Sequence, residues 1–81
     1  MINVLFFGKL RDDFQLDQTK IEAPCQNMSE LFNLLAQKHP QLSTLKDTNS
    51  LLIAINQDMA DASASLKHGD EVAFFPPVTG G

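Results

Sequence analysis

The sequence predicts an α+β fold in which one main helix packs across one face of a mixed β-sheet. Three features predict this arrangement. Runs of β-branched and aromatic residues mark strands near both ends of the chain, one amphipathic helix lies between them, and another apolar run follows the helix. A hairpin, a helix that crosses the sheet and a returning last strand are typical of a sheet with its helix on one face.

The first predicted strand is the apolar run INVLFF, residues 2–7. Because successive side chains of a strand point to opposite faces, this strand is apolar on both sides. Such a strand is either central and covered, or has one side that awaits a partner. We expect Leu5 and Phe7 on the outer face, and these residues on the face toward the core: Ile2, Val4 and Phe6.

Residues 18–23 alternate between polar and apolar side chains, which predicts a second, half-exposed strand. We expect Thr19, Ile21 and Ala23 to point inward. A loop over residues 11–17 is predicted to join this strand to the first as a hairpin.

The predicted helix lies in NMSELFNLLAQKHP, residues 27–40. Asn27 is a favourable N-cap with Glu30 three residues later, and Pro40 is predicted to stop the helix at His39. At 100° per residue, four side chains form one apolar stripe that would pack on the sheet: Met28, Leu31, Phe32 and Leu35.

The second half of the chain supplies the remaining strands. Residues 51–55 form an apolar run of strand length, and residues 56–58 supply a turn before a minor strand near Met59 and Ala60. A turn over residues 67–70 introduces the last strand. In that strand, EVAFF, alternation places Val72 and Phe74 on one face, and Ala73 and Phe75 on the other. Burial of both phenylalanines is the alternative.

Length and composition predict one compact domain over residues 1–75. A chain of 81 residues buries only about 60% of its unfolded surface, which allows one core. The net charge is −4 and the Lys and Arg residues are scattered, so nucleic acid is not an expected partner. Cys25 is the sole cysteine, which excludes an intrachain disulfide, and no residue pattern predicts a metal site.

Location follows from the same composition. The lone cysteine favours a reducing cytoplasm. No stretch approaches the roughly 20 apolar residues of a membrane span, and the N-terminal run lacks the pattern of a secretion signal. We therefore expect a cytoplasmic protein without a membrane partner.

The last six residues, PPVTGG at 76–81, predict an extended flexible tail. Pro76 and Pro77 lack an N–H and fix φ near −65°, so the last strand cannot continue past Phe75. Gly80 and Gly81 have no Cβ, so they fit a narrow channel and leave the terminal carboxylate sterically open. A carboxylate is a poor electrophile and needs activation, for example by adenylation, before acyl chemistry. The chain itself carries no predicted catalytic side chain.

At this point the sequence strongly resembles a known family. The segments HGDEVAFFPPVTGG (68–81) and INVLFFGKLR (2–11) resemble the small subunits of molybdopterin synthase, which are ubiquitin-like sulfur carriers. The predicted helix and the apolar run LLIAINQ also fall where that family has them. The resemblance implies a β-grasp (ubiquitin-like) fold.

The resemblance also implies a function and a set of partners. Gly81 would be adenylated by an activating enzyme that uses ATP and is related to ubiquitin-activating enzymes, and the adenylate would become a thiocarboxylate. A cysteine desulfurase or rhodanese-like protein would supply the sulfur. The thiocarboxylate would then donate sulfur to cyclic pyranopterin monophosphate in the active site of the large subunit, within an assembly of two large and two small subunits. No permanently bound cofactor is implied.

Site residues carry over by position. Gly81 would carry the adenylate and the thiocarboxylate, and the residues before it would thread into the large subunit: Pro76, Pro77, Val78, Thr79 and Gly80. Phe75 would anchor the contact with the large subunit, and Met59 stands where the family often has leucine, a mild change in volume.

Other candidate residues have ordinary structural explanations beside the functional ones. Leu5 and Phe7 either extend the patch around Phe75 or lie buried under a loop. Arg11 pairs with Asp70 or Glu71, contacts a partner carboxylate, or is a plain surface charge. Cys25 is expected to be a small buried hydrophobe. We expect a helix-end or turn role, not catalysis, for His39 and His68.

Three other functions compete with this one. A ubiquitin-like modifier would use the same adenylate but join Gly81 to lysine amines. The sulfur carrier of thiamin biosynthesis is a close relative, but it lacks the FFPPVT approach to its glycines. An interaction domain with an inert tail is the third alternative.

Overall fold

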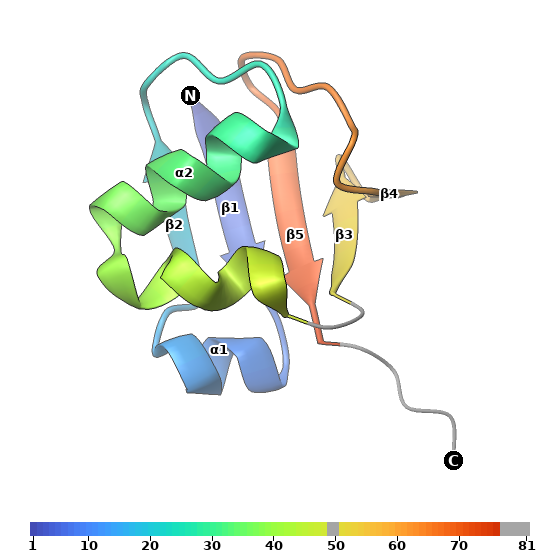
Figure 1. Ribbon diagram of the computed structural model, residues 1–81. Helices are drawn as coiled ribbons and strands as arrows, with labels where there is room; N and C mark the ends of the chain where they lie inside the picture. Colours follow the sequence, from blue (N-terminus) through green and yellow to red (C-terminus); the bar gives the residue numbers. More distant parts are fainter. Residues whose placement is uncertain (49–50, 77–81) are drawn as a thin grey trace.

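The computed structural model describes residues 1–48 and 51–76 of the chain. Figure 1 shows a sheet with two helical segments across one face and a short helix beyond one end. The strands lie in the order β2-β1-β5-β3-β4; β1 and β5 are parallel and the other neighbours are antiparallel. The predicted mixed sheet is thereby confirmed. The elements are β1 (Ile2–Phe6), α1 (Lys9–Phe14), β2 (Gln18–Ile21), α2 (Met28–Lys38), the 3-10 helix η1 (Pro40–Asp47), β3 (Leu52–Ile55), β4 (Asp58–Ala60) and β5 (Glu71–Phe75).

The core lies between the sheet and α2. The predicted inner face of β1 is confirmed, because its three apolar side chains are almost completely buried. Beside them, the parallel register pairs Val4 with Val72 and Phe6 with Phe74. The Phe6 and Phe74 rings stack with their centroids 5.6 Å apart. These contacts place the two central strands, and therefore the end of β5, in one rigid unit.

The predicted loop over residues 11–17 is wrong, because Lys9–Phe14 forms the short helix α1. Leu10 is buried, and the Phe14 ring lies 6.5 Å from that of Phe6. These two side chains are four residues apart, so one helical turn brings both to the core. Gln15 ends the helix in the left-handed conformation, with φ 53°. A six-residue helix of this kind depends on tertiary packing, because helices so short are marginal alone.

The second strand is shorter than predicted. β2 ends at Ile21, and Ala23 is exposed instead of pointing inward. The register explains this difference: Ile21 pairs with Ile2, the first residue of β1. Residues after Ile21 therefore have no partner strand, and alternation alone does not extend a ladder.

The predicted helix is confirmed as α2, with Asn27 as its N-cap. The Asn27 Oδ1 accepts the Glu30 N–H at 2.9 Å, and the Glu30 Oε1 accepts the Gln26 N–H at 2.8 Å. The cap and the acidic side chain therefore satisfy backbone donors reciprocally, as in a capping box. Of the predicted stripe, three side chains are buried; Phe32 is half-buried and stacks on Phe74 at 5.7 Å.

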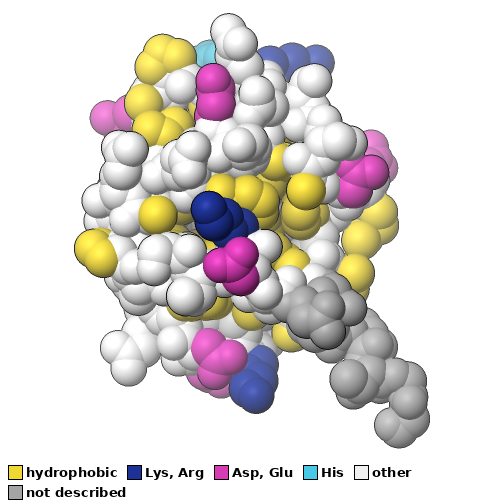
Figure 2. Space-filling view, in the orientation of Figure 1, with side chains coloured by type: hydrophobic (Ala, Val, Ile, Leu, Met, Phe, Trp, Pro, Cys, Tyr) yellow, Lys and Arg dark blue, Asp and Glu magenta, His cyan; other side chains and the backbone are white. Residues whose placement is uncertain are grey.

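The segment after Pro40, for which the sequence indicated no motif, forms η1. Leu42 and Leu45 are buried, and their spacing of three matches the three residues per turn of a 3-10 helix. Together η1 and α2 cover the inner face of the sheet, as Figure 1 shows. Figure 2 views this covered side, where hydrophobic, acidic and basic side chains are interspersed.

The minor strand expected near Met59 is confirmed as β4, which pairs with β3. The turn between them is tight, because Asn56 and Gln57 both have positive φ, 51° and 73°. Two consecutive residues of positive φ match the right-handed twist of a hairpin. Asp58, predicted to belong to the turn, is the first residue of β4. None of the helices in the described residues is long and apolar enough to cross a membrane.

Candidate functional site

The last strand separates its side chains as the alternation predicts. Val72 and Phe74 are fully buried in the core, whereas Phe75 lies on the opposite face and is half-buried. Ala73 and Glu71 share this outer face with Phe75, because they precede it by two and four residues. The alternative, in which both phenylalanines are buried, is wrong.

Side chains from three parts of the sheet meet on the outer face and form what we call the outer patch. The patch surrounds a recess of about 400 Å³. β1 and the residue after it contribute two side chains, the β3–β4 hairpin contributes three, and β5 contributes three. These residues are Leu5, Phe7, Ala54, Gln57, Met59, Glu71, Ala73 and Phe75.

The outer patch is apolar and open. The Phe7 and Phe75 rings stack nearly parallel, with an interplanar angle of 8° and centroids 4.8 Å apart. Nevertheless Phe7 is 41% exposed and Met59 is 66% exposed. A contiguous exposed apolar surface on a small domain marks an interaction site. Of the two alternatives for Leu5 and Phe7, the structure therefore favours the patch.

The first residue of the predicted tail lies beside this patch. Pro76 is half-buried next to Gly8, where an added Cβ would lie 3.2 Å from the proline Cγ. Gly8 has a φ of 58°, in the region that favours glycine. The other tail residues with predicted roles, Pro77, Val78, Thr79, Gly80 and Gly81, lie outside the described residues.

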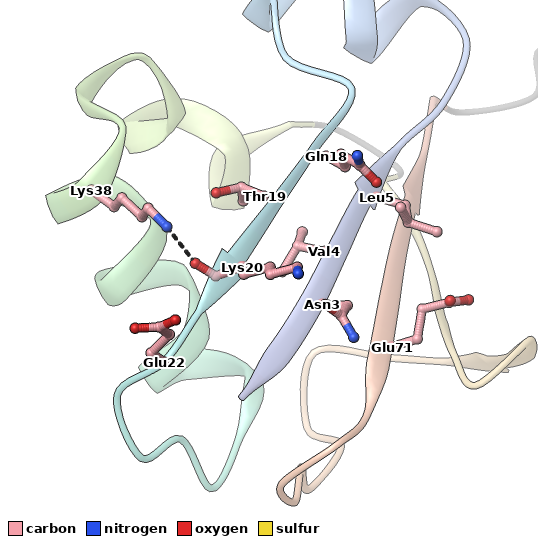
Figure 3. Close-up of a pocket in the computed structure, with 9 residues that line it drawn as sticks. All are labelled: Asn3, Val4, Leu5, Gln18, Thr19, Lys20, Glu22, Lys38 and Glu71. Carbon is pink, nitrogen blue, oxygen red and sulfur yellow. Dashed lines mark hydrogen bonds between the residues drawn. The ribbon is translucent and has the colours of Figure 1, made fainter.

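A polar cleft of about 480 Å³ adjoins the outer patch over β1 and β2 (Figure 3). Leu5 and Glu71 line both the cleft and the patch. Lys20 also lines the cleft, and its carbonyl accepts a hydrogen bond of 2.6 Å from the Lys38 ammonium, which occupies the free edge of β2. The outer face thus has an apolar half beside β4 and a polar half beside β2.

Arg11 lies far from the two acids that were candidate partners. It is exposed on α1, beyond the C-terminal end of β1. Asp70 and Glu71 lie at the other end of that strand, because Asn3 pairs with Glu71 in the parallel register. Arg11 therefore faces solvent, and its contact with a partner carboxylate stays a prediction.

Asp70 is instead held by neighbouring donors, although its side chain is only 5% exposed. One carboxylate oxygen accepts the Asn56 side-chain amide at 3.0 Å, and the other accepts the Lys67 N–H at 2.9 Å. Burial raises the pKa of the Asp70 carboxyl, but these hydrogen bonds and the nearby Lys67 charge outweigh it, so that its pKa lies below the usual value. The network ties the turn before β5 to the β3–β4 hairpin.

We expect Asp70→Asn to destabilise the fold by about 1–3 kcal/mol at pH 7, because a charged acceptor of two hydrogen bonds is lost. The wild-type contribution is present above the unfolded carboxyl pKa of about 3.9 and is lost as the pH falls through the lower folded pKa. Urea unfolding should therefore show that the variant has a lower free energy of unfolding than the wild type at pH 7, and that this difference is smaller at pH 3. Asp13→Asn, at an exposed position on α1, is the control. A deficit of equal size at both pH values would contradict this explanation.

The cysteine and the histidines have structural surroundings. Cys25 is buried and its Sγ donates to the Asn27 carbonyl at 3.5 Å; burial raises the pKa of the thiol, which disfavours the reactive thiolate. The His39 Nε2 lies 2.8 Å from the Thr19 hydroxyl, and the His68 Nδ1 contacts the N-terminal amine. In residues 1–48 and 51–76, no group of three acidic, histidine or cysteine side chains is placed to hold a metal ion.

Four residues of the patch were not proposed as site residues from the sequence: Ala54, Gln57, Glu71 and Ala73. A signal for Glu71 was present, because alternation along EVAFF places it on the same face as Phe75. Gln57 had no such signal, since its position depends on the tight turn after β3.

Comparison with solved structures defines the class of the protein. SAMP1 from Haloferax volcanii superimposes with a TM-score of 0.79 at 22% identity, over 99% of this chain and 98% of that one. A chain described as part of a protein–protein complex of subunits 1 and 2 of molybdopterin-converting factor, from Helicobacter pylori, has a TM-score of 0.66 at 28% identity; the match covers 99% and 97% of the two chains. The fold is therefore the ubiquitin-like β-grasp, as the resemblance implied.

The family follows from the sequence comparisons. The model of the ThiS family matches residues 4–81. The molybdopterin synthase sulfur carrier subunits of Haemophilus influenzae and Escherichia coli are 40% and 38% identical to this chain over 81 residues, and each match covers 100% of both proteins. The chain belongs to the ThiS family. The two carrier subunits are relatives that align with it over their full length.

Proposed function

We propose that this chain is the sulfur-carrier small subunit of molybdopterin synthase. The observation that carries the proposal is the identity of 38–40% over the full length of relatives with that name. The ThiS family match by itself names no pathway. The structure supports the proposal through the outer patch, which lies beside the residue that begins the tail.

The proposed chemistry takes place at Gly81. Its carboxylate attacks the α-phosphorus of ATP on an activating enzyme, which forms an acyl-adenylate and releases pyrophosphate. The terminal sulfur of a persulfide on a cysteine desulfurase or rhodanese-like protein then displaces AMP and forms an acyl disulfide. A second thiol attacks the donor cysteine sulfur of this acyl disulfide, which releases the thiocarboxylate and leaves the two thiols joined as a disulfide. In the large subunit this sulfur passes to cyclic pyranopterin monophosphate, toward the dithiolene of molybdopterin. The chain contributes the acyl group, and the partners contribute the catalytic residues.

The folded domain and the tail would have different roles in the complex. The domain formed by residues 1–75 docks through the outer patch, and the tail, residues 76–81, carries Gly81 into the partner's active site. The exposed Phe7 and Met59 side chains supply apolar contact area, and Phe75 supplies an aromatic anchor. Gly80 passes a narrow channel because it lacks a Cβ. Assembly as two large and two small subunits, in the cytoplasm, belongs to the same proposal.

Incubation of the chain with the activating enzyme, ATP and a sulfur source tests this function directly. Mass spectrometry of the intact protein should show that one terminal oxygen has been replaced by sulfur. The charged protein should then convert the pyranopterin precursor when the large subunit is added. An unmodified terminus, under conditions that charge the Escherichia coli relative, would contradict the proposal.

The same samples distinguish the competing functions. A ubiquitin-like modifier would form stable conjugates between Gly81 and lysine amines in a cell lysate, whereas a carrier would not. A thiamin-type carrier would be charged in the same way but would not support the large subunit of molybdopterin synthase. An inert tail would leave the mass unchanged.

A further inference from the structure

The outer patch contains one carboxylate, that of Glu71. This side chain is half-buried and lines both the apolar recess and the polar cleft; Figure 3 shows it in the cleft. The hydrogen bonds of Glu71 in the described residues are made by its backbone, and no described lysine, arginine or histidine pairs with the carboxylate. In the free chain, water therefore solvates this charge.

The backbone of Glu71 is held firmly. Its N–H donates to the Asn56 Oδ1 at 3.0 Å, and its carbonyl accepts the Asn56 N–H at 2.8 Å. Asn56 is in turn held by the buried Asp70 carboxylate. The base of the Glu71 side chain is thus placed before any partner arrives, which lowers the entropy lost when its carboxylate is bound.

A partner that covers Phe75 also covers Glu71. They are four positions apart along β5, a distance of about 13 Å. A stable interface buries about 800 Å² on each side, which is wide enough to include both. Leu5 and Met59 lie in the next row of the same face, between Glu71 and Phe75, because Leu5 and Ala54 pair with Ala73 and Met59 pairs with Ala54. Docking would therefore remove water from the carboxylate, and a buried charge without a partner strongly opposes association.

We infer that the large subunit presents a basic side chain, of the kind that arginine provides, which pairs with Glu71 where the outer patch meets the polar cleft. Arginine fits best because its planar guanidinium binds a carboxylate through two hydrogen bonds. The net charge of −4 on this chain agrees with a basic partner surface. This inference rests on the proposed function, and it assigns Glu71 as a residue that determines partner specificity.

The test is the kinetics of association between the full chain and the isolated large subunit. Glu71→Gln should weaken Kd at least about tenfold, mainly through faster dissociation, because truncating one member of a buried charge pair acts on koff. Glu71→Lys should weaken it further. The matched control is Glu22→Gln, which makes the same change in the polar cleft but outside the outer patch. We expect the Kd of this control variant to stay within about twofold of the wild-type value, with any change confined to kon.

The outcomes separate the inference from the function on which it rests. If the wild-type chain does not bind the large subunit, the proposed function and the inference both fall. If the wild type binds and Glu71→Gln behaves like Glu22→Gln, only the inference is overturned. Circular dichroism should show both variants folded at the assay temperature, since the Glu71 side chain makes no bond in the described part of the fold. A Glu71→Gln variant that is folded and dissociates faster supports the pair.

Discussion

Deletion of Gly81 is expected to abolish sulfur transfer to the pyranopterin while the chain still binds the large subunit. The acyl group that would be adenylated is lost from its required position, and the terminus of the shortened chain lies one residue short of the active site. Because the proposed docking residues belong to the folded domain, the affinity should change by less than about tenfold. Single-turnover conversion and equilibrium binding, measured on the same preparation, check the two halves of this expectation.

A short peptide fused after Gly81 should have the same effect, because it converts the carboxylate to an amide that cannot be adenylated. The same peptide fused before Met1 is the matched control and should leave transfer intact, since Met1 is not in the outer patch. Sulfur transfer that survives the C-terminal fusion would show that Gly81 does not carry the sulfur. Loss of binding together with transfer would instead assign the tail to docking.

Phe75→Glu is expected to weaken the complex with the large subunit at least about thirtyfold, which is the loss typical of an interface hot spot. The substitution removes the ring that stacks on Phe7 and places a second carboxylate in the patch that contains Glu71. The measurement is Kd for the large subunit, by calorimetry or by surface-based binding. The domain should stay folded, because Phe75 is only half-buried whereas the neighbouring Phe74 fills the core.

Gln37→Glu is the control for the added charge. Gln37 is exposed on α2, on the side of the sheet away from the outer patch. The affinity of the Gln37→Glu variant for the large subunit should therefore stay within about twofold of the wild-type value. Thermal unfolding followed by circular dichroism should confirm that both variants are folded. If Phe75→Glu binds as tightly as Gln37→Glu, the patch is not the docking surface.

The strands of the central pair could be predicted because their residues satisfy the local and the global pattern together. Residues 2–6 and 71–75 are rich in β-branched and aromatic side chains, and their alternation places Val4 and Phe74 in the core. The helix α2 was predictable for the same reason, since its cap at Asn27, its stripe and the proline after it agree.

The predictions that were wrong concern segments whose secondary structure is determined by strand pairing and packing with distant parts of the chain. Residues 9–14 carry little helical signal of their own, and they are helical because Leu10 and Phe14 reach a core built by other strands. The second strand stops at Ile21 because β1 begins at Ile2. Neither cause can be read from the segment itself.

The candidate site divides in the same way. Phe75 and Met59 were proposed from the sequence, but their proximity depends on a sheet order that places β3 between β4 and β5. The turn at Asn56 and Gln57, with two residues of positive φ, brings the hairpin back beside Glu71. The predicted roles of residues 77–81 stay predictions, because those residues lie outside the described structure.

Local residue chemistry was therefore enough to predict one small mixed α+β domain whose last strand ends at Phe75, before Pro76. Alternation, capping and proline geometry act over a few neighbouring residues, so they can be identified directly in the sequence. The outer patch, the solvated Glu71 carboxylate and the Asp70–Asn56 network arise only in the folded molecule. They join residues up to about 70 positions apart, and contacts of that range depend on strand register and loop closure.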